Sequence, residues 1–194
     1  MSERRPGFLE RLKLPYLEAR FPGRAVKASF VFINGFITIA LLAAVAMASR
    51  TPFVFPSLGP TAFLLFFSPR LPASSPRNTL YGHAIGILCG WGALWITGLQ
   101  DAPPAIVTGV DFPRVLAAAL SLAATGAFMV LANAPHPPAG ATTLIVSLGI
   151  VTRPPHLAMI ELAVALLAFQ AIVINRLAGV GYPVWAAPKE GSGI

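Results

Sequence analysis

Charge and cysteine are scarce in this chain, and each scarcity excludes a class of protein. Only 11% of the 194 residues are charged, whereas a soluble domain carries roughly 25% charged residues. The single cysteine, Cys89, lies in an apolar stretch, which excludes a disulfide framework, a CxxC redox pair and a cysteine zinc cluster. Because 56% of the residues are hydrophobic, the composition indicates an integral membrane protein made of one membrane domain.

Sequence patterns of catalysis are missing as well. The chain contains no GxSxG elbow, no Walker loop and no HExxH motif. Of the seven carboxylates only Glu161 falls inside a full-length apolar segment, and the three histidines are too dispersed to bind haem. We therefore expect no enzyme activity, no cofactor and no metal site.

Basic residues gather at the start of the chain. Seven of the 14 lysines and arginines fall within residues 1–27, and the formal net charge is +7. Under the positive-inside rule this pattern predicts a cytoplasmic tail on a protein of the cell (inner) membrane, and no nucleic-acid surface. Apolar residues alternate with the charges, which favours a short interfacial helix interrupted at Pro15; a tail that only orients the protein is the alternative.

Long apolar segments predict an all-α polytopic membrane protein. Four of them have the length of about 20 residues that one helical crossing needs. The A-x-A triplet at 46–48 does not turn the first segment into a signal peptide, because its 22 residues exceed an h-region of about 7 to 15. The four full helices are expected over residues 28–49, 80–99, 113–132 and 156–177.

Two further apolar segments are broken by proline and glycine, so each can hold only a half-length helix, at 57–68 and at 139–151. A shift of 81 residues lays PSLGPTAFLL over PPAGATTLIV and places Gly59 on Gly140. The order of full helix, broken segment and full helix therefore occurs twice. Repeat 1 covers residues 28–99, repeat 2 covers 113–178, the whole membrane domain covers 28–178, and a C-terminal tail covers 179–194.

If both broken segments cross the membrane, the chain forms two inverted three-segment repeats with six crossings. The first broken segment, extended over residues 51–56 and then helical, reaches about 38 Å, which exceeds a hydrocarbon core of about 30 Å. Both termini then lie in the cytoplasm, with 11 basic residues inside and 3 outside. The alternative is four crossings plus two re-entrant segments, which gives 10 inside and 4 outside and also satisfies the charge rule.

Paired broken segments in the two halves of a transporter predict a binding site near the midplane. The inverted arrangement would bring together the helix N-termini near Ser57 and Pro138, whose free N–H groups and partial positive charge suit a small anion. Gly59 and Gly140 would let the backbone approach the ion. Close helix packing is the alternative role of these glycines and prolines. Further hydroxyl donors are expected from Thr61, Thr142 and Thr143.

Ionisable residues within the apolar zone are candidates for gating or proton coupling. His136 adjoins the proposed site as an anion ligand or proton carrier, or else as a helix cap. His83 could pair with it, although a bond to a neighbouring carbonyl is the expected role. Glu161 is either a proton relay or, as we expect, the partner of a basic residue. We expect Arg77 to attract anions at the inner mouth and Asn78 to cap a helix.

Three motifs occur in a fixed order, PSLGPTAFLLFFSP, PRNTLYGH and HPPAGATTLIV, and together they resemble the HPP family of small integral membrane proteins. The family is named for the triplet found here at 136–138, and the resemblance covers residues 30–175. Members in photosynthetic organisms are associated with nitrite transport, so the resemblance implies a transporter of a small monovalent anion, with nitrite as the expected substrate. Pro60 departs from the family pattern, which has a small residue there. The matching motif residues are Gly59, Thr61, Pro76, Arg77, Asn78, Gly82, His83, His136, Pro137, Pro138, Gly140 and Thr142.

Other functions remain open at this stage. A membrane scaffold or sensor subunit would explain the helices but not the paired breaks, and an anion channel would fit the same pattern as a carrier. The expected partners are a small inorganic anion and the lipid bilayer. Small residues, such as those at 117–119 and 123–127, would also permit a homo-oligomer.

Overall fold

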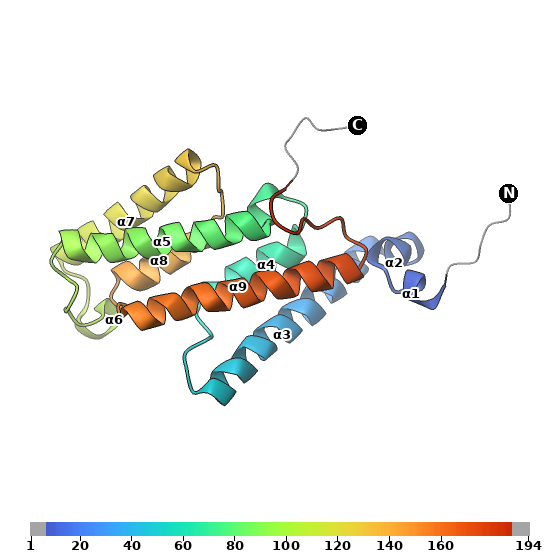
Figure 1. The fold of residues 1–194 in the computed structure, drawn as a ribbon, viewed down its shortest axis with the longest axis horizontal. Coiled ribbons are helices and arrows are strands. Elements are labelled where there is room, and N and C mark those ends of the chain that lie inside the picture. Colours follow the sequence, from blue (N-terminus) through green and yellow to red (C-terminus); the bar gives the residue numbers. More distant parts are fainter. Residues whose placement is uncertain (1–6, 188–194) are drawn as a thin grey trace.

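The computed structural model describes residues 7–187, and within that range the chain forms α-helices, one 3₁₀ turn and no strand (Figure 1). The elements are α1 (Phe8–Arg11), α2 (Leu14–Arg20), α3 (Gly23–Ser49), α4 (Leu58–Phe67), η1 (Pro72–Ser74), α5 (Pro76–Ile96), α6 (Ala105–Thr108), α7 (Phe112–Leu131), α8 (Ala139–Ser147) and α9 (Pro154–Leu177).

Four of these helices, α3, α5, α7 and α9, are long and apolar enough to cross a membrane, which confirms the four full helices expected from the sequence. Several boundaries differ: α3 begins at Gly23 and not at 28, α5 ends at Ile96 and not at 99, and the start of α5 differs most in meaning. The stretch before Leu80 was expected to be a polar loop, yet α5 already begins at Pro76. Ser75 is its N-cap, because the Ser75 side chain accepts a hydrogen bond from the N–H of Asn78. The prediction that Asn78 caps this helix is therefore wrong.

The basic N-terminal tail is helical over much of its described length. It forms two short helices, α1 and α2, and Pro15 lies in the first turn of α2, where proline is tolerated. The interruption predicted at Pro15 thus falls just before it. The N–H of Leu14 donates to the carbonyl of Ala178 at 2.8 Å, so α2 is attached to the end of α9.

The two broken segments form short helices, as the sequence predicts, with 10 residues in α4 and 9 in α8. Pro60 sits in the first turn of α4, and α4 ends just before the Pro69 region. α8 ends at Ser147 instead of Val151, because Gly149 adopts a φ of 79° that stops the helix.

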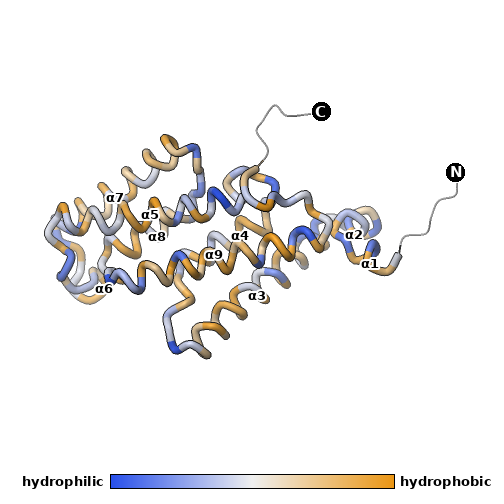
Figure 2. The backbone as a smooth tube through the Cα atoms, in the orientation of Figure 1, coloured by the Kyte–Doolittle hydropathy of each residue, from blue (hydrophilic) through white to orange (hydrophobic). Residues whose placement is uncertain are grey.

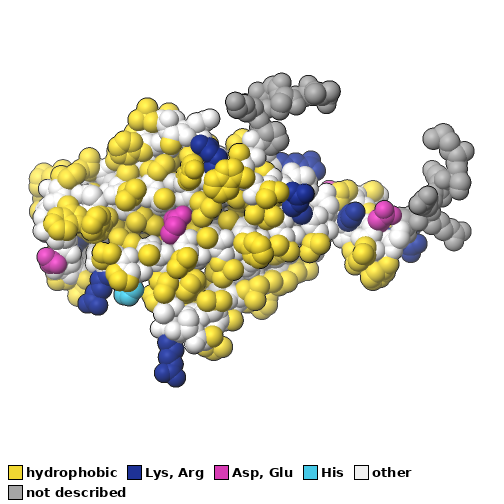
Figure 3. All heavy atoms as spheres, in the orientation of Figure 1, with side chains coloured by type: hydrophobic (Ala, Val, Ile, Leu, Met, Phe, Trp, Pro, Cys, Tyr) yellow, Lys and Arg dark blue, Asp and Glu magenta, His cyan; other side chains and the backbone are white. Residues whose placement is uncertain are grey.

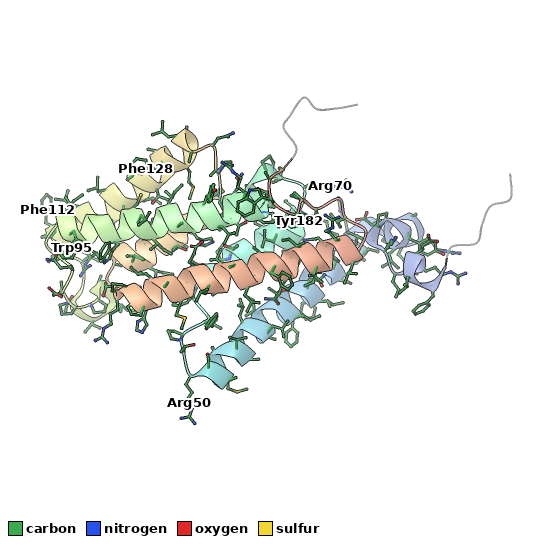
Figure 4. The ribbon with its side chains drawn as sticks, in the orientation of Figure 1. Arg50, Arg70, Trp95, Phe112, Phe128 and Tyr182 are labelled. Carbon is green, nitrogen blue, oxygen red and sulfur yellow. The ribbon has the colours of Figure 1, made fainter. Side chains whose placement is uncertain are left out.

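The bundle has two ends, which Figure 4 marks by Arg70 and Tyr182 on one side and by Trp95 and Phe112 on the other. The first, here called the tail end, holds the start of α5 and the ends of α4, α7 and α9. The second, the loop end, holds the end of α5, the end of α8 and the starts of α7 and α9. Arg50, at the end of α3, points away from the bundle (Figure 4).

Hydrogen bonds close each end of the bundle. At the tail end, the phenol of Tyr182 donates to the carbonyl of Ser74, and burial raises the pKa of this phenol, which keeps it a donor. At the loop end, the N–H of Ala105 donates to the carbonyl of Leu148 at 2.9 Å, which ties α6 to the end of α8. These bonds place the end of α4 and the end of α8 at opposite ends of the bundle.

Each short helix packs in an equivalent way. α4 lies against α3 and α9, while α8 lies against α7 and α5. The full helices contact each other as α3 with α9, α5 with α7, and α5 with α9. Apolar residues cover most of the helices and polar residues gather at their ends (Figure 2), and the visible face is hydrophobic with basic side chains at its periphery (Figure 3). The largest fully buried apolar side chains are Leu42, Leu58, Leu65, Phe66, Leu94, Ile160 and Leu167.

A ridge of glycines on α5 lets α8 approach unusually closely. A Cβ added at Gly86 would lie 2.8 Å from the carbonyl oxygen of Ala139, and one at Gly90 would lie 2.7 Å from that of Thr143. The spacing of Gly82, Gly86 and Gly90 is the small-xxx-small pattern that brings membrane helices together. Close helix packing, which was the alternative role of the glycines in the broken segments, is thus the role of the glycines on α5.

Candidate functional site

A cluster of four polar side chains lies at the centre of the bundle, and each of them is fully buried. Thr61 comes from α4, His83 from α5, His136 from the loop before α8, and Thr142 from α8. The two threonines are the pair that the 81-residue shift superposes. The cluster therefore joins the first turns of both short helices through one residue of α5.

Hydrogen bonds run through all four side chains. The hydroxyl oxygen of Thr61 lies 2.9 Å from Nε2 of His83 and 3.3 Å from Nε2 of His136. Nδ1 of His83 lies 2.7 Å from the hydroxyl oxygen of Thr142. Nδ1 of His136 lies 2.7 Å from the carbonyl oxygen of Ala73. The result is one continuous chain of polar contacts through an apolar interior.

The absence of a side chain at Gly82 allows the two imidazoles to meet. A Cβ built at Gly82 would lie 2.6 Å from Cβ of His136, a distance that real Cβ atoms do not reach. With glycine there, His136 packs directly on α5, and the ring centroids of His83 and His136 are 5.0 Å apart. His83 was expected to bind a neighbouring carbonyl; it binds two threonine hydroxyls instead.

The N–H groups that the sequence analysis expected to be free are engaged. The N–H of Leu58 donates to Phe55 at 2.9 Å, and that of Gly140 donates to Pro137 at 2.9 Å. The N–H of Gly59 donates to the carbonyl of Pro56 over a longer 3.4 Å. Tight turns at the start of each short helix thus satisfy these donors locally. These engaged N–H groups leave the side-chain hydroxyls as donors that a ligand could use.

Three buried hydroxyls next to the cluster have no hydrogen-bond partner within residues 7–187. Ser57 precedes Thr61 by one turn of α4, Thr79 precedes His83 by one turn of α5, and Thr143 follows Thr142. All three are fully buried. An unsatisfied buried hydroxyl costs free energy, so these three are available to donate to a ligand; Thr38, Ser147, Gln170 and Asn175 also have unpaired buried atoms elsewhere within residues 7–187. Thr79 escaped the sequence analysis, although its i−4 spacing from His83 could have identified it.

The starts of the two short helices also face a common hollow of about 690 Å³. Its lining includes Gly59, Pro60, Pro137 and Pro138, together with Ala73, whose carbonyl binds His136. The lining is mostly apolar. Gly59 and Pro137 are exposed and Pro138 is half-buried, so the hollow lies beside the cluster and opens on the surface of the bundle.

Glycines at these helix starts are not forced by packing. A Cβ at Gly59 would meet no atom within 4 Å, and one at Gly140 would meet only the flexible end of Leu122, at 3.3 Å. Both positions thus have room for a side chain in this conformation.

Arg77 is not a free charge at the mouth of the bundle. Its guanidinium donates to the carbonyls of Ala132 and Asn133, at 3.3 and 2.9 Å, and to Oδ1 of Asn78 at 3.0 Å. Arg77 therefore closes the end of α7. Its charge stays partly exposed, so attraction of anions by Arg77 stays a prediction, and Asn78 in turn donates to the carbonyl of Pro72 at 2.9 Å.

Glu161 is half-buried in α9, and the structure gives it no basic partner among the residues it describes. Its Oε2 is buried without a hydrogen bond. The expected ion pair with a basic residue is therefore wrong for this part of the chain. Nor do residues 7–187 contain a group of three or more His, Cys, Asp or Glu side chains that could hold a metal ion.

Comparison with known proteins agrees with this architecture. Residues 21–183 match the family described as HPP, transmembrane region. Two proteins of Dictyostelium discoideum, each named only as a transmembrane protein, are 31% identical over 118 residues and 27% identical over 128 residues. These matches cover 59% and 64% of this chain but only 35% and 41% of the relatives, so the chain spans well under half of their length. No solved structure matches.

The family match includes every residue of the buried cluster, the glycine ridge of α5 and both short helices. It covers far more than half of the chain. This protein therefore belongs to the HPP transmembrane family.

Proposed function

We propose that this protein transports a small monovalent anion, with nitrite as the substrate to test first. The observation that carries the proposal is the fully buried, hydrogen-bonded cluster of Thr61, His83, His136 and Thr142, which contains two of the chain's three histidines and joins the starts of both short helices. Polar groups inside a membrane protein cost free energy and usually mark a substrate pathway. Nitrite is chosen because of the family resemblance.

The chemistry of the cluster suits an anion that is small and singly charged. Ser57, Thr79 and Thr143 have unpaired hydroxyls, and hydroxyls donate well to oxyanions. The first turns of α4 and α8 add the partial positive charge of two helix N-termini. The lysines and arginines of the described residues are absent from the cluster, so the field there is weak, which favours release as well as binding.

Complete burial of the cluster favours a carrier over an open channel. All four side chains have no exposed surface, so an anion reaches them only if helices move apart. Such occlusion is what alternating access requires. A saturable flux would support the carrier, and a flux that rises linearly with anion concentration would indicate a channel.

We also propose six crossings in two inverted repeats, with both termini in the cytoplasm. The argument is that α4 ends at the tail end and α8 ends at the loop end, so the two short helices run toward opposite ends of the bundle, as inverted repeats require. The contacts also correspond between the two repeats. The contact of α3 with α4 matches that of α7 with α8, and the contact of α4 with α9 matches that of α8 with α5. The basic residues of α2 and the start of α3 belong to the tail end.

Single cysteines would test this topology in a Cys89→Ser background. Arg70→Cys at the tail end and Asp101→Cys at the loop end both replace exposed side chains. A membrane-impermeant maleimide added to inside-out vesicles should label Arg70→Cys only, and added to intact cells it should label Asp101→Cys only. Labelling of both from the same side would reject the six-crossing arrangement.

Flux into liposomes tests transport itself. Purified protein should take up nitrite faster than empty liposomes at alkaline pH, where little membrane-permeant nitrous acid is present, with nitrate, formate and chloride as comparison anions. The double variant Thr61→Val, Thr142→Val should lose most of this flux. Thr38→Val is the matched control, because Thr38 is equally buried on α3 and has no hydrogen-bond partner within residues 7–187. Absence of flux for all four anions in folded protein would favour a scaffold.

A further inference from the structure

Counting donors and acceptors fixes the positions of the protons in the buried cluster. The carbonyl of Ala73 can only accept, so Nδ1 of His136 must carry the proton that it donates. In a neutral His136 ring, Nε2 is then an acceptor. The hydroxyl of Thr61 lies 3.3 Å away and can donate to it.

The same count determines the tautomer of His83. The one proton of Thr61 goes either to Nε2 of His136 at 3.3 Å or to the carbonyl of Ser57 at 3.2 Å, so in both cases Nε2 of His83 is the donor in its 2.9 Å contact with Thr61. Nδ1 of His83 is then an acceptor, and the hydroxyl of Thr142 donates to it at 2.7 Å. When Thr61 donates to His136, all bonds point in one direction, from Thr142 through His83, Thr61 and His136 to Ala73.

One added proton reverses this direction without breaking any contact. If Thr142 receives a proton, it passes its own proton to Nδ1 of His83. The proton on Nε2 of His83 then passes to the hydroxyl of Thr61. The original hydroxyl proton of Thr61 passes to Nε2 of His136. His136 becomes an imidazolium, His83 becomes the Nδ1–H tautomer, and Thr142 and Thr61 are hydroxyls again. The proton count rises by one, and every donor still meets an acceptor.

We infer that the chain of Thr142, His83, Thr61 and His136 is a binding site and relay for one proton, which is carried together with the anion. The relay stands on the hydrogen-bond geometry. The role of the proton as a second substrate rests on the proposed transport function.

The surroundings limit the cluster to a single extra charge. Two imidazolium rings with centroids 5.0 Å apart would repel each other in a buried site, so the second ring stays neutral. Among the helices around the rings, α4 and α8 supply hydroxyls, and His136 is the ionisable side chain that lies against His83. Arg77 donates to the carbonyls at the end of α7, and Oε2 of Glu161 on α9 has no hydrogen-bond partner within residues 7–187, so neither bonds to the rings.

Joint binding of a proton and an anion also solves an electrostatic problem. Moving a lone anion into a fully buried site costs several kcal/mol in effective desolvation. A positive charge on His136 would neutralise the pair, and the partners would enter and leave together. The expected transport is therefore electroneutral, with one proton for each anion.

Nitrogen-15 NMR of histidine-labelled protein in lipid nanodiscs tests the relay directly, because protonated and unprotonated ring nitrogens have well-separated shifts. The chain has three histidines, so His83→Gln, His136→Gln and His156→Gln assign the signals. At high pH we expect His83 as the Nε2–H tautomer and His136 as the Nδ1–H tautomer. As pH falls, His83 should change to Nδ1–H with the same midpoint at which His136 gains its second proton.

Thr61→Val should uncouple the two rings, because it removes the atom that joins them. His136 would then gain its proton without a change of tautomer at His83. Thr38→Val should leave the coupling intact. An Nδ1–H tautomer of His83 at high pH, or no protonation of His136 while the protein stays folded, would overturn the relay.

Proton movement during transport is measured separately, with a pH dye inside proteoliposomes and an imposed nitrate gradient, since nitric acid is too strong to leak as the neutral form. Nitrate uptake with an equal uptake of protons supports the second substrate, and Thr61→Val should reduce the proton-to-anion ratio. Anion uptake without proton uptake would overturn coupling while leaving the proposed transport intact. If no tested anion moves, transport itself fails, whereas the NMR result still decides the relay.

Discussion

The two short helices rest on different surfaces, although they occupy corresponding places in the fold. α8 lies on α5, whose facing ridge is made of glycines, and we call this contact the glycine seam. α4 lies on α9, and we call that contact the leucine seam. The positions 81 residues after Gly82, Gly86 and Gly90 are Ala163, Leu167 and Ala171, all fully buried.

This difference separates a rigid seam from an adaptable one. In the glycine seam, backbone meets backbone, and even a methyl group on Gly86 would lie 2.8 Å from a carbonyl oxygen. In the leucine seam, the side chain of Leu167 stands between two alanines, and a leucine side chain can change rotamer as helices slide. If the bundle opens to admit an anion, we therefore expect α4 to move and α8 to stay with α5.

The helix ends show the same contrast. A buried guanidinium, that of Arg114, holds the end of α8 through a 3.0 Å bond to the carbonyl of Ser147. At the end of α4 the side-chain donors are neutral: the amide of Asn175 donates to the carbonyl of Leu65 at 3.2 Å, and the hydroxyl of Ser74 lies 3.3 and 2.6 Å from the carbonyl oxygens of Leu64 and Ser68. A charged donor bonds more strongly than a neutral one, so the two ends differ in the kind of bond that attaches them.

Removing side-chain volume should affect the leucine seam most. Leu167→Ala should lower the free energy of unfolding by about 2 to 5 kcal/mol, because it leaves a cavity in a fully packed interior. Leu162→Ala, on the exposed side of the same helix, should change it by less than about 0.5 kcal/mol. Thermal unfolding in detergent measures both. Equal stability of the two variants would show that α9 is not packed as described.

Removing the charged donor should loosen α8. Arg114→Met deletes bonds to the carbonyls of Ser147 and Pro103, at 3.0 and 2.9 Å, and leaves the buried carbonyl of Ser147 without this donor. We expect a loss of roughly 3 kcal/mol in the free energy of unfolding. Arg153→Met is the control, since Arg153 is exposed at the same end of the bundle. Protease cleavage near residues 148–153 should rise only in Arg114→Met.

At the glycine seam, by contrast, adding side-chain volume should destabilise the protein. Gly86→Ala and Gly90→Ala should each cost about 1 to 3 kcal/mol in the free energy of unfolding, because backbone atoms must shift. Gly92→Ala lies on the same helix with no atom within 4 Å of the new Cβ, and it should gain up to about 1 kcal/mol through helix propensity. If all three alanines stabilise α5, the close approach of α8 is not a fixed contact.

Local signals explain why the sequence predicted the helices so closely. The length of each apolar segment, together with its proline and glycine breaks, predicts each helix without information from the rest of the chain. The structure therefore differs from the prediction only in where the helices begin and end. The start of α5 was missed because Ser75 and Pro76 were assigned to a polar loop, although a serine N-cap followed by proline is a helix start.

The site was predictable only in part. Thr61 and Thr142 were identified by the internal repeat, and His136 by its triplet. Their connection through His83 was not, because contacts between residues 22 to 75 positions apart depend on helix packing. The engagement of the N–H groups at the helix starts was also missed, because it depends on the turn geometry of two proline-rich loops. The G-x3-G-x3-G pattern of α5 was visible in the sequence but was not used.

The smallest effect on stability is expected where the effect on the ligand should be largest. Ser57→Ala and Thr143→Val remove buried hydroxyls without partners in residues 7–187, one beside each seam, so the free energy of unfolding should stay within about 0.5 kcal/mol of the parent or rise. If these hydroxyls bind the anion, the rise in melting temperature that nitrite gives the parent protein should shrink in both variants. Ser49→Ala, an exposed change at the end of α3, should keep the full rise. A reduced rise for Thr143→Val alone would place the anion beside the rigid glycine seam, with α4 serving as the gate. Equal reductions would place it between the two short helices, and unchanged rises in both would move the anion site away from these hydroxyls.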